Sequence, residues 1–264
     1  MSGEEVVKER VTPSKTKLWG ASIAWIVVYG ALIGVTSLIP IFPYVGGGGF
    51  LPLCVVFEAM APLILGPAGI ISAFIGGVIG MFIMPAAFPL GLLDVFLTGT
   101  LPAITVALTI RDDKLWYITV PVFAIIGIFF TIFPYHWPGA AAGLEANPPE
   151  PMYSLLAAWY WVPWLIIEAS PLGRKLVPQW ALEAGKKRYW GVFIAVISGM
   201  MIWWMPWAIT YWYLLKYPIA LAIATFIAYS WWVPALSVII TIITIPIIEG
   251  LRRSGLPKIP WAIW

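Results

Sequence analysis

The chain contains few of the side chains that hold cofactors and metal ions in other proteins. Among its 264 residues there is one cysteine, Cys54, and one histidine, His136. A single cysteine excludes a disulfide bond within the chain and a cysteine-rich metal or iron–sulfur site. A single histidine excludes a haem held between two histidines of this chain. We therefore expect no cofactor and no metal centre.

Familiar catalytic motifs are missing as well. The sequence contains no phosphate-binding loop, so the chain is not expected to hydrolyse ATP itself. It has neither the HExxH motif of a membrane metalloprotease nor the Gly-x-Ser-x-Gly elbow of a serine hydrolase. We therefore expect a protein that is not an enzyme.

Charged residues are scarce. They make up 10% of the chain, while hydrophobic residues make up 61%; a soluble domain carries about 25% charged residues. Gly and Pro, 24 of each, are common in membrane helices. The net charge of +3 does not indicate nucleic-acid binding, because the basic residues cluster in loops. The composition predicts an all-α, polytopic transmembrane bundle in the cell membrane.

Long apolar runs predict about eight spans in a single bundle over residues 18–250. A transmembrane helix needs about 20 apolar residues, and the runs approach or exceed that length. If the sixth and seventh runs are re-entrant or interfacial, six crossings remain. The predicted spans are Leu18–Ile39, two spans within Phe50–Met84, Leu92–Ile110, Leu115–Phe133, Tyr153–Ala169, Trp190–Leu214 and Pro218–Ile248.

The distribution of basic residues predicts the orientation. If the N-terminus is cytoplasmic, only Lys216 of the 15 Lys and Arg residues falls on the outer side of the membrane. Loops on the cytoplasmic side carry the excess of Lys and Arg in membrane proteins. We therefore expect both terminal segments, residues 1–17 and 251–264, to be cytoplasmic.

The stretch from Phe50 to Met84 is the most unusual part of the chain. Two short apolar segments, interrupted by Pro and Gly, are joined by Gly66–Gly69, and Glu58 lies inside the first. Irregular backbone in a membrane persists only where it is buried in protein or lines a cavity. Because a charge there is costly, Glu58 is predicted to contact a ligand or bind a proton. Alternatively, it is a protonated carboxyl bonded to backbone freed by Pro62.

Other candidates lie near the predicted outer side. Asp94, near the start of its span, is either a ligand contact or a carboxylate favoured by the helix dipole. His136, beside Trp137 in an outer loop, is either a binding residue or a solvated side chain. Interior tryptophans, among the 17 of the chain, are predicted to pack or to form the wall of a pocket for a flat ligand.

The first predicted span contains two pairs of small residues, and the two members of each pair are four positions apart. They allow close helix approach, either within the chain or against a partner membrane subunit. The residues are Gly20, Ala24, Gly30 and Gly34.

Parts of the sequence resemble the substrate-binding S component of energy-coupling factor vitamin transporters. The resemblance covers the first four predicted spans and the tail. It is carried by LIPIFPYVGGGGFLPL (38–53), LGPAGIISAFIGGVIG (65–80), MPAAFPLG (84–91) and IPIIEGLRRSG (245–255).

The resemblance implies a protein that captures a vitamin-like molecule from outside the cell. It also implies delivery together with a transmembrane coupling protein and two ATPases. The loop Tyr44–Gly49, which includes Gly47 and Gly48, would cap the site. The small residues of the first span would meet the coupling protein.

The leading hypothesis is therefore a substrate-binding membrane subunit of a nutrient importer. Glu58 and Asp94 would supply polar contacts, and aromatic side chains would form the walls. Two alternatives remain open: a structural subunit of a respiratory or oxidase-type complex, and a proton-coupled carrier that uses Glu58.

Overall fold

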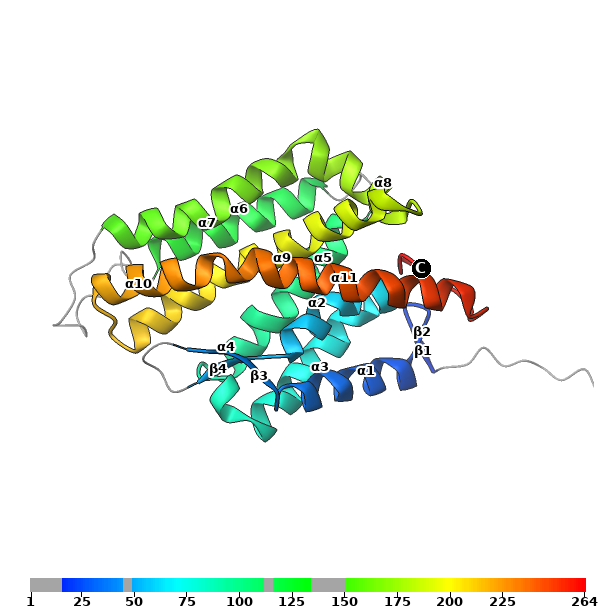
Figure 1. Ribbon diagram of the computed structural model, residues 1–264, viewed down its shortest axis with the longest axis horizontal. Helices are drawn as coiled ribbons and strands as arrows, with labels where there is room; N and C mark the ends of the chain where they lie inside the picture. The colour runs from blue at the N-terminus through cyan, green and yellow to red at the C-terminus, as the bar shows by residue number, and fades with distance from the viewer. Residues whose placement is uncertain (1–15, 45–48, 112–115, 134–150) are drawn as a thin grey trace, which may run out of the picture.

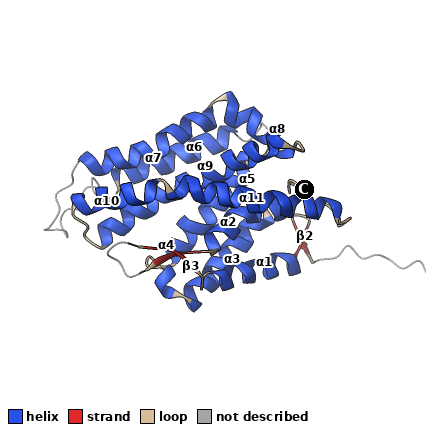
Figure 2. Ribbon diagram, in the orientation of Figure 1, coloured by secondary structure: helices blue, strands red, loops and turns tan. Residues whose placement is uncertain are grey.

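The computed structural model describes residues 16–44, 49–111, 116–133 and 151–264. These residues are almost entirely helical, with two short antiparallel two-stranded sheets (Figure 2). The prediction of an all-α architecture is confirmed. The helices are α1 (Ile23–Thr36), α2 (Cys54–Leu65), α3 (Ala68–Ile83), α4 (Leu92–Asp94), η2 (Val95–Thr100), α5 (Leu101–Thr109), α6 (Trp116–Ile132), α7 (Pro151–Ala169), η5 (Leu172–Leu176), α8 (Val177–Leu182), α9 (Lys186–Leu214), α10 (Ile219–Ser230) and α11 (Trp232–Arg253).

Three helical stretches of the described residues are long and apolar enough to cross a membrane. They are Leu92–Thr109, Lys186–Leu214 and Ile219–Arg253. A fourth is added if the pair Ser154–Ala169 and Leu172–Leu182, bent by 62°, counts as one span. Helices α1, α2, α3 and α6 are apolar but shorter. The helices lie roughly along the long axis of the molecule (Figure 1).

Helix α1 begins later than the sequence predicts. Trp19 and Gly20 adopt φ angles of 48° and 84°, which turn strand β1 (Lys17–Leu18) back onto β2 (Ala21–Ser22). The helix therefore starts at Ile23 and has 14 residues. The expected helix from Leu18 is wrong for this reason.

Helix α9 lies at the centre of the bundle. It packs against α5, α7, α8 and α11, and every residue from Ala195 to Trp212 is buried. A helix that is apolar on all sides is stable only when other elements surround it. Four tryptophans of α9 are therefore core residues and not members of an interfacial belt: Trp203, Trp204, Trp207 and Trp212. The fifth, Trp190 near the start of the helix, is exposed.

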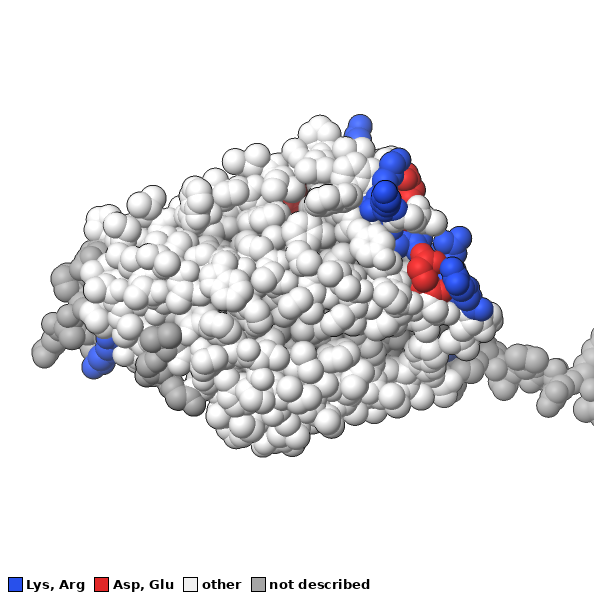
Figure 3. All heavy atoms as spheres, in the orientation of Figure 1, with Lys and Arg blue, Asp and Glu red and all other residues white. Residues whose placement is uncertain are grey.

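Charged side chains gather at one end of the molecule, where α8, the end of α11 and the C-terminus lie (Figures 1 and 3). We call this the basic end. Arg111 also belongs there, since its guanidinium lies 4.2 Å from the ring centre of Trp261. The sides of the bundle expose large apolar residues such as Val28, Phe82 and Ile227, as expected for a surface that faces lipid.

Candidate functional site

The candidate site lies toward the end opposite the basic end, where strands β3 (Pro40–Pro43) and β4 (Phe50–Pro52) approach α9 and α10 (Figure 1). The two strands pair antiparallel, and the Tyr44 amide donates a hydrogen bond of 2.9 Å to the Gly49 carbonyl. The Tyr229 hydroxyl of α10 donates to the Pro43 carbonyl at 2.8 Å. Tyr44, directly after strand β3, therefore lies against α9, where its ring contacts Trp207 and Tyr211.

Asp94 joins this region to the centre of the bundle. Its side chain is buried, and its two carboxylate oxygens accept hydrogen bonds from the Leu90 amide and the Trp207 indole. Gly91, with a φ of 62°, provides the turn that brings the Leu90 amide back toward Asp94. Asp94 therefore lies at a helix start, as one of its two interpretations has it, and it also fixes a tryptophan of α9. A ligand contact stays a prediction.

Trp207 is the centre of a stack of aromatic rings. Its ring lies 4.8 Å from that of Tyr211 at an interplanar angle of 16°. The rings of Tyr44 and Trp204 lie 4.8 Å and 6.2 Å away. These rings surround a small cavity, which we call the aromatic pocket. It is lined by Tyr44, Trp204, Trp207, Ala208, Tyr211, Trp212, Thr225 and Tyr229.

Three residues that line the aromatic pocket carry a buried polar group without a hydrogen-bond partner in the described residues: Trp204, Tyr211 and Trp212. The indole N–H groups of Trp204 and Trp212 are buried and form no hydrogen bond within the described residues. A buried donor without an acceptor costs about 1–3 kcal/mol. The pocket therefore favours an occupant that carries hydrogen-bond acceptors.

The aromatic pocket is nearly closed in this structure. Its volume is about 10 Å³, roughly the space that one water molecule needs. A larger occupant would have to displace rings or move the β3–β4 hairpin. Burial raises the pKa of the Tyr44 phenol, and the charge of nearby Asp94 adds to this rise, so the phenol stays a neutral donor.

Glu58 lies outside the aromatic pocket. Its side chain is buried against Gly99 in the π-helix η2; a Cβ atom at Gly99 would lie 2.6 Å from Glu58 Oε1. Within the described residues, neither carboxyl oxygen accepts a hydrogen bond of standard geometry. The Cys54 thiol, one turn earlier in α2, is a weak donor facing this carboxyl. The expected bond to backbone freed by Pro62 is not formed.

The predicted docking strip on α1 is largely covered from within the chain. A Cβ atom at Gly34 would lie 2.5 Å from Ile79 Cγ2, and one at Gly30 would lie 3.1 Å from Ile75 Cγ2. These glycines let α1 pack closely on α3. Of the two alternatives for this strip, the structure shows packing within the chain at Gly30 and Gly34.

The remaining residues of the strip differ from one another. Gly20 precedes α1 and is exposed, although a Cβ atom there would meet the Pro260 ring of the tail. Ala24 alone of the four is exposed on a helix face. Four other predicted residues lie outside the described residues: Gly47, Gly48, His136 and Trp137.

Interior tryptophans were predicted to pack or to line a pocket, but the residues that do so were not identified, and the tyrosines of α9 and α10 were not predicted at all. A signal was present, because Trp204, Trp207 and Tyr211 are spaced three and four residues apart and so share one helix face. The spacing alone could not distinguish a packed face from a pocket wall.

The described residues contain no group of three or more His, Cys, Asp or Glu side chains that could hold a metal ion. Comparison with protein-family models, curated proteins and solved structures found no match for the chain. The chemistry of the aromatic pocket is therefore the basis on which a function is assigned.

Proposed function

We propose that the chain is the substrate-binding membrane subunit of an importer for a small, flat, aromatic or heterocyclic nutrient. Separate ATPase subunits would energise it through a transmembrane coupling protein. The observation that carries the proposal is the aromatic pocket, whose lining residues include stacked rings and two tryptophans with buried indole donors that have no acceptor within the described residues.

The pocket chemistry favours a flat molecule with acceptor atoms. Ligand sites are mostly apolar, with a few convergent polar groups that set orientation. Faces such as those of Trp207 and Tyr211 stack on aromatic rings. Ring nitrogens or carbonyl oxygens would accept from the Trp204 and Trp212 indoles.

The proposed topology places the aromatic pocket toward the outside of the cell. Cytoplasmic loops are enriched in Lys and Arg, so the basic end would face the cytoplasm with both terminal segments. The helical segments from α1 to α11 would then cross about eight times, with α10 and α11 as one crossing. Tyr44 would belong to the loop that opens to admit the substrate.

Purification from native membranes, followed by mass spectrometry of proteins and small molecules, tests this proposal. We expect a retained heterocyclic metabolite, two ATPases and a coupling protein. Binding of that metabolite is then measured for the double variant Trp204→Phe/Trp212→Phe, which keeps an aromatic ring at each position, though a smaller one, and removes both donors. Loss of two hydrogen bonds should weaken binding about tenfold or more.

The matched control is Trp159→Phe, since Trp159 is exposed on the side of the bundle. It should bind as the unmodified protein does. Co-purification with redox proteins and no metabolite would overturn the proposal and favour a structural subunit instead.

A second candidate, a proton-coupled carrier, is favoured by one observation. Glu58 is buried with no hydrogen-bond partner of standard geometry among the described residues, and buried carboxyls of this kind mark proton relays in pumps and transporters. The carrier predicts pH-driven uptake by the chain alone in liposomes, abolished by Glu58→Gln. The importer predicts no uptake without ATPases.

A further inference from the structure

A second cavity lies at the basic end, far from the aromatic pocket. It has a volume of about 330 Å³ and is lined by the start of α9, the end of α11 and the tail. We call it the basic cavity. Its cations are Arg188, Arg252 and Lys258, and its apolar walls include Leu182, Leu256 and Trp264.

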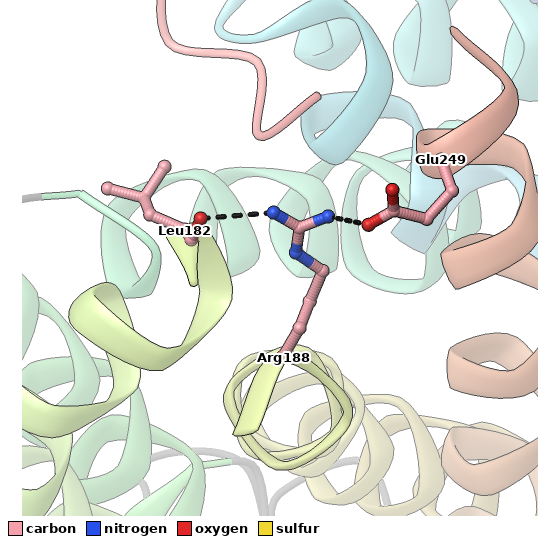
Figure 4. A network of polar contacts seen from close by, with 3 residues as sticks. All are labelled: Leu182, Arg188 and Glu249. Atoms are coloured by element: carbon pink, nitrogen blue, oxygen red, sulfur yellow. Dashed lines mark hydrogen bonds and ion pairs between the residues drawn. The ribbon is translucent and has the colours of Figure 1, made fainter. Parts of the chain in front are cut away.

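Arg188 is fixed in the wall of this cavity (Figure 4). Its guanidinium is buried and bonds to the Glu249 carboxylate of α11 and to the Leu182 carbonyl, the latter at 3.0 Å. Leu182 ends α8, where carbonyls have no partner within the helix. Arg188 Nε is buried and has no acceptor within the described residues.

The positive charge of the basic cavity exceeds its negative charge. Glu249 offsets one of the three cations by pairing with Arg188. Neither Arg252 nor Lys258 forms an ion pair within the part of the chain that the structure describes. The cavity therefore attracts an anion.

The tail makes a fixed wall for this cavity. The Trp264 indole donates to the Ile64 carbonyl at 2.8 Å, and the Ile263 amide donates to the Leu63 carbonyl at 3.1 Å. Both acceptors belong to the last turn of α2. Because the tail is anchored in this way, Lys258 is held beside the cavity.

We propose that the basic cavity binds the phosphate group of an anionic phospholipid. Arg and Lys bind phosphate oxygens through charge-assisted hydrogen bonds. Basic pockets at the cytoplasmic side of membrane helices bind anionic headgroups, and the apolar wall of Leu182, Leu256 and Trp264 suits the glycerol and upper acyl region. This inference requires the basic end to meet a membrane surface but does not depend on the importer.

The test compares lipid retention in detergent by native mass spectrometry. The purified full chain is incubated with equal amounts of phosphatidylglycerol and phosphatidylcholine. The variant Arg252→Gln/Lys258→Gln removes two lining charges without touching the Arg188–Glu249 pair. We expect preferential retention of phosphatidylglycerol by the unmodified chain, reduced about tenfold or more in this variant.

The matched control is Arg253→Gln/Lys216→Gln, which loses the same charge. Arg253 neighbours Arg252 but does not line the cavity, and Lys216 follows the far end of α9. This control variant should retain as much phosphatidylglycerol as the unmodified chain does. Equal loss in both variants, or no preference for phosphatidylglycerol, would overturn the site.

A competition with inorganic phosphate separates the two possible sources of the group. If millimolar phosphate does not displace the lipid, the phospholipid is the ligand. If phosphate displaces it fully and binds the unmodified chain but not the cavity variant, the site stands and its ligand is a soluble phosphate compound. None of these readouts measures transport, so the importer proposal can fail independently.

Discussion

The Trp207 indole donates a hydrogen bond to the carboxylate of Asp94, a residue 113 positions earlier in the chain. This bond joins the start of the fourth predicted span to the central helix α9. It also sets the position of the ring around which the aromatic pocket is built.

Trp207→Phe should destabilise the protein by about 1–3 kcal/mol, because a buried carboxylate oxygen of Asp94 loses its donor. Thermal unfolding in detergent measures the effect. The control is Trp212→Phe, which removes a buried indole N–H that has no acceptor within the described residues. Its loss of stability should be smaller, and equal losses would show that ring packing alone matters.

Asp94→Asn and Glu58→Gln should have different effects on the free energy of unfolding. Both Asp94 oxygens accept from N–H donors, so an amide nitrogen there would face another donor and destabilise the fold by about 1–3 kcal/mol. Glu58 oxygens accept no hydrogen bond of standard geometry, so Glu58→Gln should be neutral or stabilising. Denaturation midpoints compare the two, and a larger loss for Glu58→Gln would contradict the described environment.

Gly99→Ala should destabilise the bundle, because its Cβ would lie 2.6 Å from Glu58 Oε1. Overpacking of this kind costs about 1–3 kcal/mol. In a double-mutant cycle, Glu58→Ala should relieve most of the cost of Gly99→Ala, since the two residues are in contact. Additive changes in the free energy of unfolding would mean that a methyl group at position 99 does not contact the Glu58 side chain.

Gly34→Ala should also be destabilising, by about 1–3 kcal/mol, since Ile79 leaves no room for a methyl group. Ala24→Leu, on an exposed position of the same helix, should be tolerated. Unfolding temperature in detergent, measured for the isolated chain, checks both. Full tolerance of Gly34→Ala would reopen the possibility that this strip binds a partner.

Much of the helical layout could be predicted from the sequence, because long apolar runs have few alternatives in a membrane. The two segments separated by the Gly-Pro turn are α2 and α3, and α3 begins directly after the turn, at Ala68. The last predicted span, Pro218–Ile248, is divided at Trp231 into α10 and α11. Pro234 and Pro246 both lie within α11. Pro234 is in its first turn, where the missing N–H costs nothing.

The aromatic pocket could not be predicted in the same way. It joins Tyr44, Trp207 and Tyr229, which lie in three separate segments of the chain. No local periodicity encodes which segments become neighbours. Asp94 could be named as a candidate from the sequence because a charged residue within an apolar span is rare. A single tryptophan could not be chosen among the 17 in the chain.

The bonds from the tail to the last turn of α2 connect residues 200 positions apart. During synthesis, α2 and α3 therefore leave the ribosome long before the groups that complete the carbonyl pairing of Leu63 and Ile64 exist. The hairpin of α2 and α3 therefore gains these contacts only after Trp264 has been synthesised. Any step that fuses, trims or blocks this tail acts on the maturation of the first half of the molecule.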